Sequence, residues 1–245
     1  MTHTSKAKLK ILADPEALAH YAADWLLAAA TEKQGVFAVA LSGGSTPRGL
    51  YERLAQAPYR DAFPWSRAHW FWGDERFVPP DDTSSNYRMV REALLSHVPV
   101  PKANIHAIPT EHMSAAAAAS AYEAELRSFY GTGHLDPASP LFDVVFLGLG
   151  ADGHTASLFP GSPELEEQSR WVGAVVGPGG DTRITLTYPA LESARHAVFL
   201  VDGEQKKTIL GRYWRGDSDL PAARFHPTGA LCVFADVAAA GDTPS

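Results

Sequence analysis

A histidine and an aspartate lie two residues apart in a glycine-rich stretch, and they are the side chains of this sequence best suited to move a proton. The stretch reads GLGADGHTASLFPG and contains Asp152 and His154. An imidazole titrates near neutral pH, which makes His154 a candidate general base. A structural histidine that only hydrogen-bonds to its own loop is the alternative. The sequence leaves open whether Asp152 orients His154 or only shapes the loop.

The same stretch also spells G-x-G-x-x-G directly after an apolar run, Phe142 to Leu147, which is the pattern of a dinucleotide-binding turn. Such a turn needs a real helix after its glycines and an acidic residue about 20 residues later. Here Pro160 ends the segment after about one helical turn, and Arg170 lies near the place of the acid. A nicotinamide site is therefore disfavoured.

A zinc site is disfavoured as well. Asp152 and His154 would supply two ligands, but the sequence contains no His-Glu-x-x-His motif and no cysteine cluster. The single cysteine, Cys232, lies in an apolar run and is expected to be a buried structural thiol. One cysteine also excludes a disulfide framework and fits a reducing compartment.

A small-residue loop between an apolar strand and a helix is the best candidate for holding an anion. It consists of Ser42, Gly43, Gly44, Ser45 and Thr46. Its glycines let the backbone approach a ligand, and the free N–H groups at the start of the helix favour a phosphate. The Gly-Lys-Ser/Thr of a nucleotide-binding loop is absent, as is the G-x-S-x-G of a nucleophile elbow. A plain tight turn with a serine cap is the alternative.

Three basic side chains could bind the same anion. Arg76 follows an aromatic strand within Gly73-Asp74-Glu75-Arg76, and it could bind a carboxylate or phosphate or stabilise a developing oxyanion. Arg183 begins a short extended segment, and Lys206 opens a helix. The alternative for each is an ordinary surface charge, and for the Asp74 segment a solvated turn.

Alternating strands and helices must position these residues, which predicts an α/β sandwich with a mostly parallel sheet in one domain. Loops at the carboxyl ends of parallel strands form ligand sites, so loops 42–46, 73–76, 150–157 and 202–206 are expected to share one site. Strands are expected at 36–41, 69–72, 105–108, 143–149, 171–176, 183–186, 196–201 and 230–235. Helices are expected after Asp14, through Leu50 to Leu54, at 87–95, in the alanine-rich segment ending near Tyr130, and at 203–213.

Charge and hydropathy restrict the partners. The formal net charge is -7, from 28 acidic and 21 basic residues, and no basic stripe is present, so neither nucleic acid nor a membrane surface is expected as a partner. No apolar run approaches the roughly 18 residues of a membrane span, and no signal peptide is indicated. These features together predict a cytoplasmic protein.

Taken together, the sequence resembles the 6-phosphogluconolactonase family over about residues 9 to 235. Its motifs occur along the chain in the same order as in that family. The resemblance implies a single-domain Rossmann-like, doubly wound sheet with helices on both faces. It implies hydrolysis of 6-phospho-D-glucono-1,5-lactone to 6-phosphogluconate in the oxidative pentose phosphate pathway, with no metal and no organic cofactor. The segments that carry it are Leu41 to Pro47, Trp72 to Arg76, Ser85 to Tyr87, Gly148 to Pro160, Arg183 to Thr185, and Val201 to Lys206.

The resemblance also implies residue roles. Residues 42–46, with Arg183 and Lys206, would hold the 6-phosphate. His154 would be the base that takes a proton from the attacking water and returns it to the ring oxygen. The remaining candidates, which would line the sugar end, are Asp74, Arg76, Asn86 and Asp152.

Two other functions stay open at this point. The first is a glucosamine-6-phosphate deaminase/isomerase, which has a similar phosphate loop and the motif Asp-Gly-His-Ile-Ala-Phe-Asn-Glu-Pro. In place of the last four residues of that motif, this sequence has Ser157-Leu158-Phe159-Pro160. A non-catalytic phosphosugar-binding protein would keep the loop and Arg183 without needing a histidine beside an acid. The protein is expected to be a monomer or a weak homo-oligomer.

Overall fold

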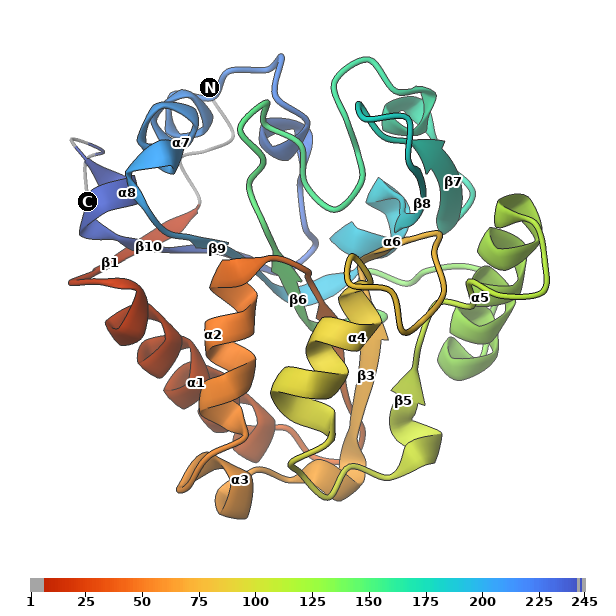
Figure 1. Ribbon diagram of the computed structural model, residues 1–245, viewed down its shortest axis with the longest axis horizontal. Helices are drawn as coiled ribbons and strands as arrows, with labels where there is room; N and C mark the ends of the chain where they lie inside the picture. Colours follow the sequence, from red (N-terminus) through yellow and green to blue (C-terminus); the bar gives the residue numbers. More distant parts are fainter. Residues whose placement is uncertain (1–6, 242, 244–245) are drawn as a thin grey trace.

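The computed structural model of the protein describes residues 7–241 and 243, and within them seven parallel strands form a central sheet (Figure 1). Every neighbouring pair in this sheet runs parallel. In spatial order the strands are β1 (Lys8–Leu12), β10 (Ala230–Asp236), β9 (Ala194–Val201), β6 (Phe142–Leu147), β2 (Phe37–Leu41), β3 (Ala68–Trp72) and β5 (Ile105–His106).

Helices cover this sheet, which confirms the expected doubly wound α/β class. Strands β2 and β6 are buried at every position, as expected where other elements cover both faces of a parallel strand. Helices α1 and α2 lie together on one side of the molecule, and α5 lies on the opposite side (Figure 1). The helices are α1 (Pro15–Glu32), α2 (Ser45–Leu54), α3 (Tyr59–Ala62), α4 (Asn86–Val90), α5 (Ala115–Tyr130), α6 (Tyr188–Glu192), α7 (Lys207–Trp214) and α8 (Val237–Ala240).

The strand order reverses between β2 and β6, which lie next to each other in the middle of the sheet. From β2 the chain builds outward through β3 and β5, and from β6 it builds the other way through β9 and β10. The loops that follow β2 and β6 therefore leave the sheet side by side at their carboxyl ends. A ligand site is expected at such a reversal.

A second, antiparallel sheet of three strands was not anticipated. It joins β4 (Asp74–Arg76), β8 (Thr182–Leu186) and β7 (Val172–Val176), in that order. Strands β7 and β8 are separated by only five residues, whereas a parallel pair needs a crossover of about a dozen. The segments predicted at 171–176 and 183–186 are therefore strands, but they lie outside the parallel sheet.

Several element boundaries also differ from the prediction. Strand β1 had no clear sequence signal, because it is an edge strand that pairs with β10 alone and none of its five residues is fully buried. The helix expected over 87–95 is α4 followed by a π-helical turn, Arg91–Leu95, and the helix expected from Gly203 begins as a 3-10 turn before α7. Strand β5 ends at His106, two residues early.

Two smaller predictions are confirmed. Asp14 caps α1 by accepting the N–H of Ala17, with Pro15 in the first turn. Cys232 is buried in β10 with a free thiol. In the described part of the chain, no helix is both long and apolar enough to cross a membrane.

Candidate active site

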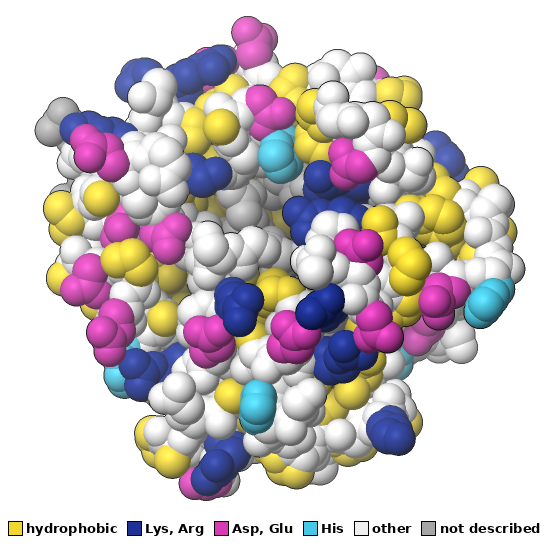
Figure 2. Space-filling model, in the orientation of Figure 1, with side chains coloured by type: hydrophobic (Ala, Val, Ile, Leu, Met, Phe, Trp, Pro, Cys, Tyr) yellow, Lys and Arg dark blue, Asp and Glu magenta, His cyan; other side chains and the backbone are white. Residues whose placement is uncertain are grey.

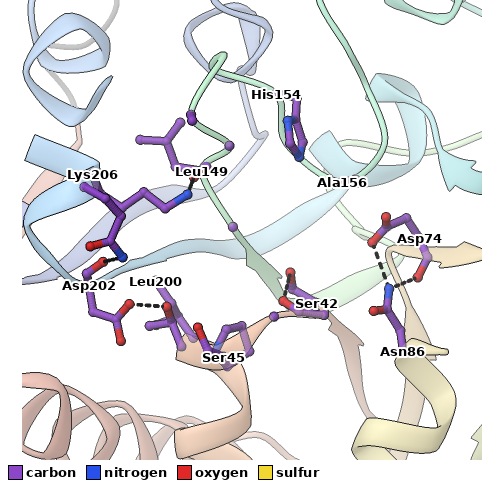
Figure 3. A pocket seen from close by; sticks show the side chains of 18 of the residues that line it. Ser42, Ser45, Asp74, Asn86, Leu149, His154, Ala156, Leu200, Asp202 and Lys206 are labelled. Atoms are coloured by element: carbon purple, nitrogen blue, oxygen red, sulfur yellow. Dashed lines mark hydrogen bonds between the residues drawn. The ribbon is translucent and has the colours of Figure 1, made fainter. Parts of the chain in front are cut away.

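A pocket of about 290 Å³ opens at the carboxyl ends of β2, β6 and β9, at the reversal point of the sheet. Figure 2 shows a hollow near the middle of this face with Lys or Arg side chains on both of its flanks. Figure 3 shows the polar side chains that converge on it. The predicted site residues that line it are Ser42, Gly43, Gly44, Ser45, Thr46, Asp74, Arg76, Asn86, His154, Arg183 and Lys206.

Asp152 is the one predicted site residue that does not line the pocket, and it contacts His154 instead. Its Oδ1 lies 2.5 Å from the Nδ1 of His154 and accepts the backbone N–H of the same residue. Partial burial alone would raise the pKa of Asp152, but the N–H of His154 and the charge and ring of His154 outweigh it and lower that pKa. In the neutral form of the ring, an ionised Asp152 favours the tautomer with its proton on Nδ1, and Nε2 then carries the lone pair.

The glycines of this stretch make room for the histidine–aspartate pair. A Cβ on Gly150 would collide with the His154 ring and with Asp152, so a side chain there would displace the pair. Gly153 has a φ of 85°, and a Cβ on it would collide with Leu220. The G-x-G-x-x-G spelling thus reflects the packing of a turn around His154. Figure 3 shows that ring pointing into the pocket.

The small-residue loop does form the start of a helix. Helix α2 begins at Ser45 after Gly44, whose φ of 102° requires glycine, and no side chain caps it. The first N–H groups of α2 are thus available to an anion. The Thr46 hydroxyl, however, donates to Oδ1 of Asp202 at 2.6 Å. Thr46 can therefore offer its backbone N–H more readily than its hydroxyl.

Lys206 lies on the same side of the pocket as Asp202 and Ser45 (Figure 3). Its ammonium donates one hydrogen bond, of 2.6 Å, to the carbonyl of Leu149. Because an ammonium carries three donors, two remain for a ligand. The carbonyl of Leu149 thus fixes the Lys206 charge in the pocket, beside the turn that follows β6.

Two arginines are paired on neighbouring strands of the second sheet. Arg76 of β4 is the register partner of Arg183 of β8, and both line the pocket. Like charges directly opposite on one face of a sheet repel. Arg183 is partly compensated by Asp181, at 2.6 Å, and by Asp74, at 4.0 Å. An anion bound in the pocket would relieve the remaining repulsion.

Asp74 is nearly buried and is held from two sides. Its Oδ2 accepts the hydroxyl of Ser157 at 2.6 Å, and its backbone carbonyl accepts Nδ2 of Asn86 at 2.9 Å. The Oδ1 of Asn86 in turn accepts Nη1 of Arg76 at 2.7 Å. Asn86 also packs against Gly43, where a Cβ would collide with its amide, so this group contacts the small-residue loop directly.

The polar residues Ser157, Asp202 and Glu75 lie in loops that the sequence predicted to share the site, but the sequence did not single them out as site residues. The first two hold predicted site residues by hydrogen bonds from distant parts of the chain, which no local pattern reveals. Glu75 did carry a signal, because it alternates with Asp74 and Arg76 along a strand and must face the other way. No group of three or more His, Cys, Asp or Glu among residues 7–241 and 243 is arranged to hold a metal ion.

The fold and the pocket together place the chain among the α/β enzymes that work at the carboxyl ends of parallel strands. A family described as glucosamine-6-phosphate isomerases/6-phosphogluconolactonase matches residues 13–234. The chain therefore belongs to this family, which confirms the resemblance found in the sequence.

Named relatives agree with the family. A 6-phosphogluconolactonase of Nostoc sp. is 39% identical over 244 residues, covering 97% of this chain and 98% of the relative. One of Synechocystis sp. is 43% identical over 212 residues, covering 84% and 85%. The crystal structure of a 6-phosphogluconolactonase from Thermotoga maritima superposes with a TM-score of 0.81 at 31% identity, covering 94% of this chain and 100% of that one.

Proposed function

We propose that this chain hydrolyses 6-phospho-D-glucono-1,5-lactone to 6-phospho-D-gluconate, the lactone-opening step of the oxidative pentose phosphate pathway, with His154 as general base. The activity is the one that the names of the Nostoc and Synechocystis relatives state. One observation carries the role of His154. Its Nδ1 is held by Asp152 at 2.5 Å while its ring points into a pocket that also contains the free start of α2.

The proposed reaction begins with neutral His154. Its Nε2 takes a proton from a water molecule, and the resulting hydroxide forms a bond to the lactone C1 carbonyl carbon. The tetrahedral oxyanion is stabilised by Arg76 or by loop N–H groups. The bond between C1 and the ring oxygen then breaks, and protonated His154 returns its proton to that oxygen. Asp152 holds the ring in one orientation and stabilises its charged form.

The phosphate of the substrate would lie at the start of α2. Residues 42–46 and Lys206 line the pocket, and the N–H groups at the start of α2 would bind the phosphate, whereas the N–H of Ser42 already donates to the hydroxyl of Tyr51. Arg183 would reach the substrate from the second sheet. Asp74, Arg76 and Asn86 form one hydrogen-bonded group beside them, which we assign to the sugar end.

A deaminase/isomerase is the second candidate, and the surroundings of His154 argue against it. The glutamate that its motif places before the proline is replaced here by Phe159. That phenyl ring is buried and packs on His154, with ring centroids 4.8 Å apart. Asp152 is then the acid that contacts the histidine. Ring opening and proton transfer between C1 and C2 need further acid–base groups, whereas lactone hydrolysis does not.

The test is to generate the 1,5-lactone in situ by oxidising glucose 6-phosphate and to follow its loss against the spontaneous rate. The proposal predicts loss well above that rate and no ammonia release from glucosamine 6-phosphate. Ammonia release would establish the deaminase. Saturable binding of 6-phosphogluconate without lactone turnover would establish a non-catalytic binding protein.

Three broader assignments belong with this proposal. We assign the chain to one domain over 1–245 with its core at about 9–235, of which 1–6, 242 and 244–245 lie outside the described residues. The matched range 13–234 supports this assignment. We also propose a cytoplasmic location. We further propose that the protein is a monomer or a weak homo-oligomer, and sedimentation at two protein concentrations would test this oligomeric state.

A further inference from the structure

Glu75 is a buried carboxylate at the edge of the pocket, and none of the roles assigned so far uses it. Its relative exposure is 2%, and it lies between Asp74 and Arg76 on β4. A buried carboxylate is costly unless its oxygens are fully hydrogen-bonded. Burial raises the pKa of Glu75, while the N–H groups of Tyr87, Asn86 and Arg76 oppose that rise.

The two oxygens of Glu75 connect β4 to the start of α4, which lie at the two ends of the loop 77–85. Oε1 accepts the backbone N–H of Arg76 at 2.8 Å and that of Asn86 at 2.7 Å. Oε2 accepts the N–H of Tyr87 at 2.7 Å and the hydroxyl of Ser85 at 3.1 Å. The carboxylate thus joins the end of β4 to the start of α4 across the nine residues between them.

The alternation of a β-strand explains why this carboxylate stays out of the pocket. Asp74 and Arg76 line the pocket, so Glu75 between them faces the opposite side. There it borders a separate cavity whose walls include Pro79 and Tyr87. Glu75 therefore supports the loop from behind and does not approach the substrate.

The groups that Glu75 fixes are the ones that hold the Arg76 guanidinium. Asn86, whose N–H binds Glu75, accepts Nη1 of Arg76 on its side-chain oxygen at 2.7 Å. The carbonyl of Ser84 accepts the same Nη1 at 2.9 Å. If the loop shifted, both acceptors would move away from the guanidinium. The backbone of Arg76 itself is held by the same carboxylate.

We propose that Glu75 is a positioning residue for lactone hydrolysis, which fixes the loop that carries Ser84 and Asn86 and thereby aims the Arg76 guanidinium at the reacting end of the substrate. The inference rests on the proposed function. A guanidinium must be placed to within a few tenths of an ångström to stabilise a developing charge, so its supporting contacts matter for the rate.

The test is a double-mutant cycle with Glu75→Gln and Arg76→Ala. A glutamine keeps the size of the side chain, but its amide nitrogen cannot accept the two donors that Oε2 now accepts. Glu75→Gln is expected to lower kcat by about tenfold, corresponding to one or two lost hydrogen bonds. In the Arg76→Ala background the same change is expected to lower kcat by less than about twofold, because the group it positions is gone.

The matched control is Asp143→Asn, which alters another buried carboxylate far from the pocket. Asp143 accepts the N–H of Ala38 and pairs with Lys33 and Arg195 at the amino end of β6. It should lower the melting temperature and leave kcat within about twofold of wild type. Circular dichroism checks the fold of each variant, and if Glu75→Gln does not fold, Ser85→Ala replaces it in the cycle.

Three outcomes overturn the inference. The first is an unchanged kcat in Glu75→Gln, and the second is an unchanged kcat in Arg76→Ala. The third is that Glu75→Gln lowers kcat by the same factor in the wild-type and in the Arg76→Ala background. Each leaves the proposed function intact as long as the wild-type protein opens the lactone. Absence of turnover in the wild-type protein would instead refute the proposed function itself.

Discussion

At the scale of single residues, the chemistry depends on a few side chains whose remaining hydrogen-bonding groups are fixed by their neighbours. The Nδ1 of His154 is held by Asp152, and one N–H of Lys206 by the carbonyl of Leu149. Each side chain therefore presents its remaining groups to the pocket in one orientation. A ligand would meet them without a large cost in side-chain entropy.

Loss of the Lys206 charge should weaken binding of the phosphorylated substrate more than it slows the reaction. A hydrogen bond to a charged group contributes about 1.5–3 kcal/mol, so Lys206→Ala should raise the Kd for 6-phosphogluconate about 10- to 100-fold. The exposed neighbour Lys207, changed to Ala, is the matched control. Titration calorimetry measures both constants. Equal affinities in the two variants would contradict a phosphate role for Lys206.

At the scale of elements, the turn after β6 is shaped around His154, and Gly150 is where this is easiest to test. A Cβ at Gly150 would occupy space that His154 and Asp152 now fill. A Cβ at Gly148 would make only an ordinary contact, at 3.7 Å from Oγ of Ser42. The same glycine-to-alanine change should therefore have different effects at two positions of one turn.

Gly150→Ala should lower kcat by about 10²-fold or more, because the base is displaced from its position. Gly148→Ala should keep kcat within about fivefold of wild type, because no atom has to move. Steady-state kinetics on the lactone generated in situ provides both values. Similar losses in the two variants would mean that any side chain disrupts this turn, whatever the position of His154.

The sequence predicted those elements whose signals are local. The apolar runs of β2 and β6 and the cap of α1 by Asp14 are local patterns, and they were placed correctly. The second sheet was not, because its strands are short and the pairing of β4 with β8 joins residues far apart in sequence. The contacts of Glu75 with Asn86 are likewise set by tertiary structure.

The same reasoning applies to the site. Its members could be grouped from the sequence because the carboxyl ends of parallel strands meet at one edge of the sheet. Which hydroxyl or carboxylate contacts which neighbour depends on side-chain packing. The Thr46 hydroxyl bound to Asp202 was therefore beyond prediction, as was the Ser157 hydroxyl bound to Asp74.

At the scale of the whole molecule, stability should depend on a partly buried carboxylate away from the pocket. Glu192, at the end of α6, accepts the N–H of His226, and burial raises its pKa from 4.5 to about 7. Between these two values the folded state holds a proton that the unfolded state has released. The free energy of unfolding should therefore fall as pH rises through this window.

Glu192→Gln should remove this pH dependence, because glutamine does not ionise and can still accept the N–H of His226. With allowance for partial solvent screening, the variant should be more stable than wild type by about 1–2 kcal/mol at pH 8 and equally stable near pH 4.5. Urea unfolding at both pH values measures this. The control is Glu32→Gln, at an exposed glutamate. Parallel stability curves for wild type and Glu192→Gln would refute the assignment.

The most direct test of the central claim is kcat for lactone hydrolysis by His154→Ala, measured together with the affinity for 6-phosphogluconate. If His154 is the base, kcat should fall by about 10²–10⁴-fold while the Kd stays within a fewfold of wild type, because the phosphate contacts remain. The exposed His97, changed to Ala, should have no effect. Wild-type-like turnover by His154→Ala would contradict the account.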